Sequence, residues 1–241
     1  IYDREHSAIA EIEPGMVDWQ KVFMNADWLH VTGITPAISS GAAMAALEAA
    51  RSARSNGLTI SCDLNYRKNL WKWGKKASEV MPELASLCDI IVANEEDIEK
   101  VFGIHASGTN VLDSKVAADS YRYVCEELVK QVPALKLIAI TLRGSISASH
   151  NTWTGVLWQD GKFFTARKYD ITHIVDRVGS GDAFAGGLIY GLKKSLDVQT
   201  SLDFAVAASC LKHSIWGDAN LVSPEEIDKL MQGDMSGRVS R

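Results

Sequence analysis

Residues 28–63 read WLHVTGITPAISSGAAMAALEAARSARSNGLTISCD. An apolar, strand-like run at 28–34 is followed by an alanine-rich helical pattern at about 39–55 and a second strand-like run at 58–63. A strand, a helix and another strand in this order typically join two parallel strands through a right-handed crossover. The stretch therefore predicts an α/β protein built on a parallel sheet.

The same alternation continues on both sides of this stretch. The strand-like runs lie at 28–34, 58–63, 89–94 and 135–142. The helical patterns lie at about 39–55, 75–87, 114–132, 181–195, 199–212 and 224–231. A hairpin is expected within 146–168, because segments 154–158 and 162–167 flank Asp160-Gly161, a dipeptide typical of tight turns. Without repeats or Pro-rich linkers, residues 1–241 are interpreted as one domain, a mostly parallel sheet with helices on both faces.

Composition restricts the function classes. The chain has 241 residues, 46% of them hydrophobic, and a formal net charge of −5, which argues against nucleic acid as the main partner. No apolar run reaches the roughly 18 residues of a membrane span. The four cysteines, Cys62, Cys88, Cys125 and Cys210, are widely spaced and predict free thiols in a cytoplasmic protein. The chain begins at Ile1 without Met, which indicates a processed protein or a fragment without its N-terminal part.

The segment 176–187, DRVGSGDAFAGG, carries the strongest chemical signal. Glycines at 179 and 181 let backbone N–H groups converge on an anion, and Asp182 follows at the start of a predicted helix. N–H donors beside a carboxylate base suit phosphoryl transfer to an alcohol. The alternative is an ordinary glycine turn with an acid that caps the helix. The sequence has no P-loop, third dinucleotide glycine or serine nucleophile elbow.

Polar residues follow the predicted strands, where ligands gather in open α/β sheets. They are Asp63, Asn65 and Arg67, then Asn94, Glu95, Glu96 and Asp97, then Thr141, Arg143 and Gly144. Arg67 is a candidate fork for a substrate carboxylate, and Arg4 with Tyr2 beside it is a second. A salt bridge in a solvated loop and an edge-strand charge are the alternatives. Asn94 and Asp97 either cap a helix or hold Mg²⁺ through water.

With these residues in place, the chain resembles the ribokinase-like (PfkB) sugar kinases, and within them the 2-keto-3-deoxygluconate kinase branch. The signature at 176–188, with Arg177-Val178 inside it, carries most of the resemblance. Weaker matches are Tyr2-x-Arg4-x-x-Ser7-Ala8, Gly33-Ile34-Thr35, Asp63-x-Asn65-x-Arg67-x-x-Leu70-Trp71 and Gly237-Arg238-Val239.

The resemblance implies a ribokinase-like three-layer sandwich and a kinase that uses ATP and Mg²⁺ to phosphorylate the 6-hydroxyl of 2-keto-3-deoxygluconate. Asp182 would be the general base, and the N–H groups of Gly179, Ser180 and Gly181 would form the anion hole. By the same resemblance, Tyr2, Arg4 and Arg67 would bind the sugar acid. Thr141 and Gly144 would contact the nucleotide phosphates or ribose, and Ala208 and Asn220 would lie near adenine. Asn94 and Asp97 would hold Mg²⁺ indirectly.

The chain also departs from the family pattern. The Asn-x-x-Glu metal motif has Asp97 in its last place. Early sheet strands and most of a β lid, through which relatives pair, are not represented, and residues 1–13 are interpreted as a remnant of lid strands. Two alternatives stay open at this stage: a kinase for a neutral sugar such as fructose or ribose, and a binding module without catalysis.

Overall fold

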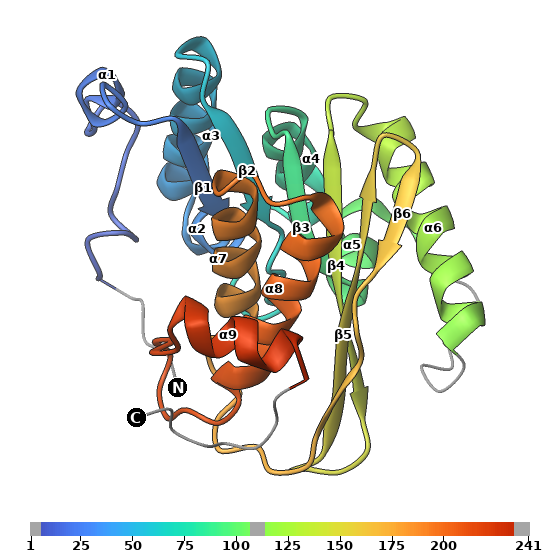
Figure 1. Ribbon diagram of the computed structural model, residues 1–241. Coiled ribbons are helices and arrows are strands. Elements are labelled where there is room, and N and C mark those ends of the chain that lie inside the picture. Colours follow the sequence, from blue (N-terminus) through green and yellow to red (C-terminus); the bar gives the residue numbers. More distant parts are fainter. Residues whose placement is uncertain (1–5, 107–113, 234–241) are drawn as a thin grey trace. The chain divides into compact units, whose positions relative to one another are not determined.

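The computed structural model describes residues 6–106 and 114–233 (Figure 1). The chain forms two compact units. The first comprises residues 1–108, 119–139 and 158–161, and the second comprises residues 109–118, 140–157 and 162–241. The interpretation of the sequence as one domain stays a prediction.

The first unit is a parallel α/β arrangement. Its strands are β1 (Trp28–Thr32), β2 (Thr59–Asp63) and β3 (Ile90–Asn94), and β4 (Leu137–Ser145) begins in it. Its helices are α1 (Trp19–Val22), α2 (Ile34–Ile38), α3 (Ser40–Ser55), α4 (Ala77–Ser86), α5 (Glu95–Phe102) and most of α6 (Ser114–Gln131). β1 pairs with β2 and β2 with β3, both in parallel. The predicted parallel sheet with crossover helices is therefore confirmed.

The alanines of α3 explain how this helix covers the sheet. Ala42, Ala50 and Ala53 are fully buried, and α3 packs against both β1 and β2. Because alanine has a small side chain and the highest helix propensity, the helix forms readily and its backbone lies close to the strands. The strand β2 is buried along most of its length, with Ile60 and Cys62 at 0% exposure.

Asp89 joins the beginnings of three strands in the first unit. Its backbone N–H donates to Ile60 O (2.8 Å), and its carbonyl accepts from the N–H of Lys136 (2.8 Å). Its buried carboxylate accepts from Ile60 N (2.9 Å) and Arg54 Nη1 (3.1 Å) and pairs with Lys136 Nζ (3.0 Å). Burial by itself raises the pKa of Asp89, but these three partners outweigh it and hold the pKa below its usual value.

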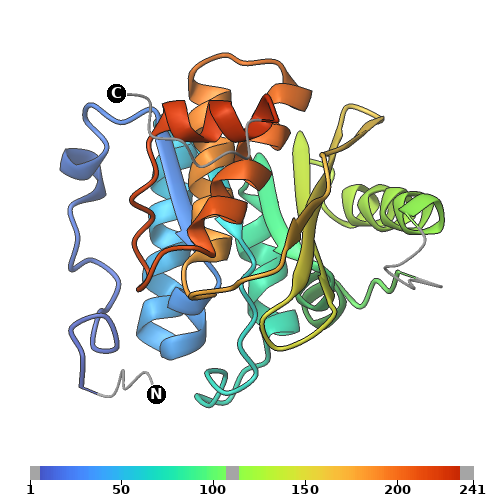
Figure 2. The same ribbon diagram turned by 60° about the horizontal axis from the view of Figure 1, so that its bottom comes forward.

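The second unit combines antiparallel strands with three helices. It contains the rest of β4, most of β5 (Asn151–Gln159), β6 (Lys162–Thr165), β7 (Tyr169–Ile171), α7 (Ser180–Lys193), α8 (Val198–Lys212) and α9 (Pro224–Met231). β5 lies between β4 and β6 in the strand order and also pairs with β7. α7 and α8 lie side by side, as the orange helices of Figures 1 and 2 show.

Glycines on α7 set its distance from α8. A Cβ on Gly187 would lie 2.9 Å from Ala205 Cα, and one on Gly191 would lie 2.9 Å from Ser201 Cα. Such distances leave no room for a larger residue at either position. Next to them, the rings of Tyr190 and Phe204 stack with centroids 4.9 Å apart.

Several local predictions can now be compared with the structure. The turn Asp160-Gly161 has positive φ at both residues, 48° and 78°, as the predicted tight hairpin requires. The strand expected at 28–34 ends at Thr32, because Gly33 turns the chain into α2 and donates its N–H to Asp63 O (2.8 Å). Residues 6–13 form turns and, within that described segment, no strand, so the lid-strand interpretation of residues 1–13 is not supported there.

The prediction about the cysteines also has a structural counterpart. All four cysteines are free thiols, as predicted. None of the helices within residues 6–106 and 114–233 combines the length and apolar character needed to cross a membrane.

The role of Asp89 gives a stability prediction. Asp89→Asn should lower the free energy of unfolding at neutral pH by about 1–3 kcal/mol, because it removes a charged acceptor from three donors. The folded pKa is lowered, so the contribution is present above the unfolded pKa of about 4 and is lost as pH falls through the folded value. Urea unfolding at pH 7, 5 and 3 should show the difference from wild type shrinking. Glu126→Gln, at an exposed position on α6, serves as the control, and an unchanged stability of Asp89→Asn at pH 7 would contradict the assignment.

Candidate active site

The glycine turn, residues 176–181, leads directly into α7 in the second unit. Gly179 is the N-cap of the helix and has a left-handed backbone, with φ at 77°. A Cβ at this position would lie only 2.1 Å from Asp218 O. Glycine is therefore required twice, for its positive φ and for the close approach of the loop that carries Asp218.

Asp176 fixes the shape of the glycine turn from its first position. Its Oδ1 accepts the N–H of Val178 (3.0 Å), and its Oδ2 accepts the N–H of Gly217 (2.9 Å). These backbone donors hold the pKa of Asp176 below its usual value. The carboxylate thus stays charged and links the turn to the loop after α8.

The N–H groups of the glycine turn are unequal as anion donors. Ser180 donates its N–H to Arg177 O at 3.3 Å. The N–H groups of Gly179 and Gly181 have no hydrogen-bond partner within the described ranges. Unpaired N–H groups at a helix start, where the dipole is positive, are the donors that an anion needs.

Asp182 lies in the first turn of α7 and is exposed. It lines a cavity of about 310 Å³ together with Ala208 of α8 and Asn220 of the following loop. The proposed base and the two residues expected near adenine therefore border one cavity. The full lining is Asp182, Ala183, Gly186, Gly187, Tyr190, Phe204, Ala208, Asp218, Asn220, Val222, Pro224 and Ile227.

Sequence reasoning missed most of this cavity, although a signal was present. Gly186 and Tyr190 follow Asp182 at intervals of four residues, which places all three on one face of α7. A Cβ on Gly186 would have nothing within 4 Å, so that face is open there, and the Tyr190 ring, stacked on Phe204, forms an aromatic wall. Asp218 could not be found this way, because the loop that carries it has no helical period.

Thr141 and Gly144 lie on β4, at positions half-buried in the second unit. Neither belongs to the lining of the cavity. Their assignment to the nucleotide phosphates or ribose stays a prediction.

In the first unit, the end of β2 leads into an unusual backbone. Asn65 has a positive φ of 38°, which is uncommon for a residue other than glycine. Its N–H donates to Asp63 Oδ1 (3.1 Å), and its Nδ2 donates to Thr32 Oγ1 (3.3 Å). These two bonds hold the turn that carries Arg67. Strained backbone of this kind is frequent at functional sites.

Arg67 is an exposed guanidinium at this turn. Its Nη1 donates to Tyr66 O (2.9 Å), the carbonyl of its own neighbour. The other N–H groups of Arg67 have no partner within the described ranges, so a fork is left for a ligand. Its charge also acts on the buried carboxyl of Asp97.

Asn94 and Asp97 form a reciprocal cap at the start of α5. Asp97 N donates to Asn94 Oδ1 (2.9 Å), and Asn94 N donates to Asp97 Oδ2 (3.0 Å). The other oxygen of Asp97 accepts the N–H of Tyr66 (2.9 Å). Burial, at 2% exposure, raises the pKa of Asp97. Both oxygens are thus used by the backbone, and the pair does not fit a direct ligand role; an indirect metal contact stays a prediction.

Tyr2 and Arg4, expected to contact the sugar acid, lie outside the described residues.

Comparisons with known proteins cover most of the chain. Residues 5–221 match the pattern of the pfkB family carbohydrate kinases. Similar curated proteins include a 2-dehydro-3-deoxygalactonokinase from Haloferax volcanii, 28% identical over 98% of this chain and 67% of its own length. Another is a 2-dehydro-3-deoxygluconokinase from Thermoproteus tenax, 30% identical over 96% and 63%.

A solved structure extends the comparison to the fold. The crystal structure of 2-dehydro-3-deoxygluconokinase from Thermotoga maritima is 43% identical, with a TM-score of 0.88 over 97% of this chain and 69% of that one. The ribokinase-like α/β fold expected from the sequence is confirmed. The chain spans about two thirds of the length of these relatives.

The close approach at Gly179 gives a second stability prediction. Gly179→Ala should lower the free energy of unfolding by about 2 kcal/mol or more, because it adds both backbone strain and a steric clash. Gly181→Ala is the matched control two residues later, since a Cβ there has nothing within 4 Å. Its helix propensity should leave stability unchanged or raise it by up to about 1 kcal/mol. Urea unfolding of both variants tests the contact, and equal stabilities would show that it is unimportant.

Proposed function

We propose that this chain, which belongs to the pfkB family of carbohydrate kinases, carries the phosphoryl-transfer machinery of a kinase for 2-keto-3-deoxygluconate, also named 2-dehydro-3-deoxygluconate. ATP is the proposed donor. The observation that carries the proposal is the glycine turn with its unpaired N–H groups, which places Asp182 at the edge of a mostly apolar cavity.

The proposed reaction follows from this arrangement. Asp182 accepts the proton of the sugar's 6-hydroxyl while that oxygen attacks the γ-phosphorus of ATP. The bond from the γ-phosphorus to its bridging oxygen breaks, and ADP leaves. The N–H groups of Gly179 and Gly181 stabilise the negative charge on the transferring group. Because Asp182 is exposed and has no cation paired with it among the described residues, its carboxylate is available for this proton.

The cavity suits the base of the nucleotide. Its Tyr190 wall offers an aromatic face, and the open stretch at Gly186 lets a flat ring approach the helix backbone. The amide of Asn220 adds hydrogen-bonding groups, although its Nδ2 already makes a long contact of 3.4 Å to Ala208 O. We assign adenine to this cavity and the phosphates to the region of Thr141 and Gly144.

Mg²⁺ is proposed as the metal that accompanies ATP and neutralises its phosphate charge. Within the described ranges, no group of three or more histidine, cysteine or acidic side chains could hold a metal. The cap formed by Asn94 and Asp97 leaves these residues an indirect role at most. Mg²⁺ typically keeps several waters and uses substrate phosphates as ligands, so the proposal assigns it chiefly to the ATP.

The acidic sugar is supported by Arg67 and by the names of the relatives. A guanidinium with unused N–H groups fits a carboxylate, which neutral sugars such as fructose and ribose lack. The Haloferax volcanii relative is named for the galacto sugar acid, so 2-keto-3-deoxygalactonate is the second candidate substrate. A cytoplasmic location and pairing with a second copy stay predictions.

The general base is tested by Asp182→Asn. The variant should lose about 10²- to 10⁴-fold in kcat, because the amide cannot accept the proton. ATP affinity, measured by calorimetry, should stay close to that of wild type, since the cavity wall is unchanged in size. Asp228→Asn, at an exposed position of α9 outside the cavity, is the control. Retained turnover in Asp182→Asn would exclude the assignment.

The substrate role of Arg67 is tested by Arg67→Ala. The KM for the sugar acid should rise by about tenfold to hundredfold, as expected for a lost charged hydrogen bond, while the KM for ATP stays unchanged. Lys68→Ala removes a neighbouring exposed cation and serves as the control. Both variants should be assayed with 2-keto-3-deoxygluconate, its galacto epimer, fructose and ribose. An unchanged KM for the acid, or faster turnover of a neutral sugar by wild type, would contradict the proposal.

A further inference from the structure

Lys212, the last residue of α8, is a charged side chain at 0% exposure. Its Nζ donates to Ile215 O at 2.9 Å, and in return Ile215 N donates to Lys212 O at 3.0 Å. Within the described ranges, Ile215 is the one hydrogen-bond acceptor of this ammonium. Burying an ammonium is costly. Neither core packing nor the proposed reaction by itself explains why a lysine is buried at this position.

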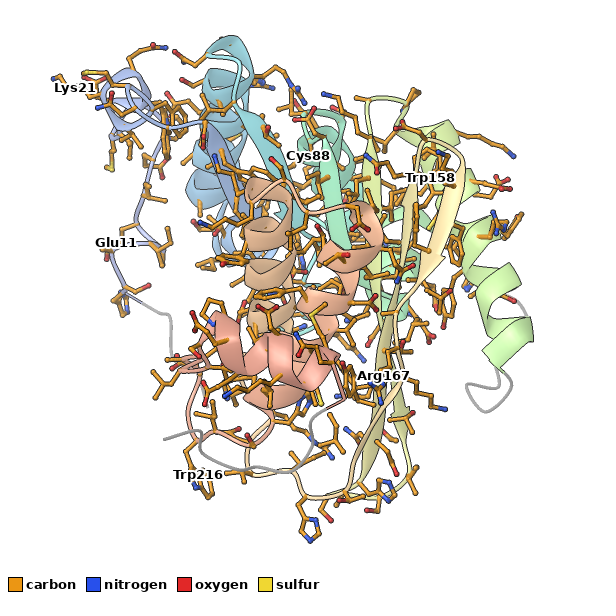
Figure 3. All side chains as sticks on the ribbon, in the orientation of Figure 1. Glu11, Lys21, Cys88, Trp158, Arg167 and Trp216 are labelled. Carbon is orange, nitrogen blue, oxygen red and sulfur yellow. The ribbon has the colours of Figure 1, made fainter. Side chains whose placement is uncertain are left out.

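The turn that Lys212 closes leads into the 214–218 loop. This loop contacts the glycine turn twice: Gly217 N donates to Asp176 Oδ2 (2.9 Å), and Asp218 O lies where a Cβ of Gly179 would be. Trp216, between them, is 80% exposed and projects from the surface in Figure 3. The loop is therefore held by its backbone contacts and not by burial of its largest side chain.

The end of α8 also contacts the glycine turn directly. His213 O accepts the N–H groups of Val175 (2.8 Å) and Asp176 (3.3 Å). One turn earlier, Ser209 Oγ donates to Ser180 O (2.7 Å). The segment that carries the proposed anion hole thus rests on the C-terminal end of α8, whose negative dipole end favours a cation.

Electrostatics connect Lys212 to the same turn. The N–H groups of Val178 and Gly217 lower the pKa of Asp176, and the charge of Lys212 acts in the same direction. His213, 1% exposed, has its pKa lowered by burial and also by the nearby charge of Lys212. The charge of Lys212 thus acts both on His213 at the end of α8 and on Asp176 in the glycine turn.

We propose that Lys212 is a positioning residue for phosphoryl transfer: its buried ammonium fixes the 214–218 loop, and through it the N–H groups of the glycine turn. The inference rests on the proposed function, because the turn matters for rate only if it binds the transferring phosphoryl group. Small displacements of such donors are costly to a reaction that depends on their orientation.

The test compares Lys212→Ala with Lys162→Ala, which removes an exposed lysine on β6 in the same unit. Lys212→Ala should lower kcat by about 10- to 100-fold and raise the KM for ATP much less, since Asp218 is the one residue of this loop in the cavity lining. Propylammonium supplies the atoms that the alanine lacks and should restore part of kcat. Lys212→Met fills the space without charge, so it should be equally slow and should not respond to propylammonium.

Hydrogen–deuterium exchange gives a readout that does not depend on activity. The peptide covering residues 176–183 should exchange faster in Lys212→Ala and Lys212→Met than in wild type, because the Val178 N–H and its neighbours lose their fixed geometry. If wild type turns over no sugar, the proposed function fails, while this measurement still tests the positioning role. Wild-type exchange in both variants, or wild-type kcat in an active enzyme, would overturn the inference.

Discussion

The close contact between Gly179 and the carbonyl of Asp218 is the constraint on which the second unit depends. A Cβ on Gly179 would lie 2.1 Å from that oxygen, so the left-handed glycine and the loop after α8 determine each other's position. Asp176 reinforces the contact by accepting N–H groups from both segments. The N–H groups of Gly179 and Gly181 beside this contact have no partner within the described ranges, and a rigid set of unpaired donors is what stabilisation of a developing anion requires.

The charged side chains discussed above differ in burial, and their hydrogen-bond partners differ accordingly. Asp182, the proposed base, is exposed beside a cavity. Asp89 and Asp97 are buried and use their oxygens to hold backbone N–H groups in place. Arg67 keeps N–H groups free at an exposed turn. The two buried carboxylates thus maintain backbone geometry, whereas the two charges proposed to act on the ligand are exposed, and burying an unpaired charge would be costly.

Local chemistry explains how much could be predicted from the sequence. Asp160-Gly161 predicted its hairpin correctly because few dipeptides adopt positive φ at both positions. Alternating apolar runs predicted the parallel strands, and the glycine signature predicted where α7 begins, within a residue. The strand at 28–34 was extended too far, since nothing local signals the hydrogen bond from Gly33 to Asp63. The helical spacing of Asp182, Gly186 and Tyr190 indicates the wall of the cavity that α7 forms. The opposite wall has no such local signal, because it comes from other segments of the chain.

The sequence by itself determined the fold class, the family and the identity of the proposed base, because these depend on periodicity and on a contiguous motif. The tertiary structure decided which N–H groups of the glycine turn remain unpaired, that Asp97 is used by a helix cap, and that Lys212 is buried near that turn. These facts depend on hydrogen bonds between segments far apart in the chain, and no local pattern encodes which donor meets which acceptor. The motif at 176–187 specifies a turn, and the end of α8 with its following loop gives that turn its shape.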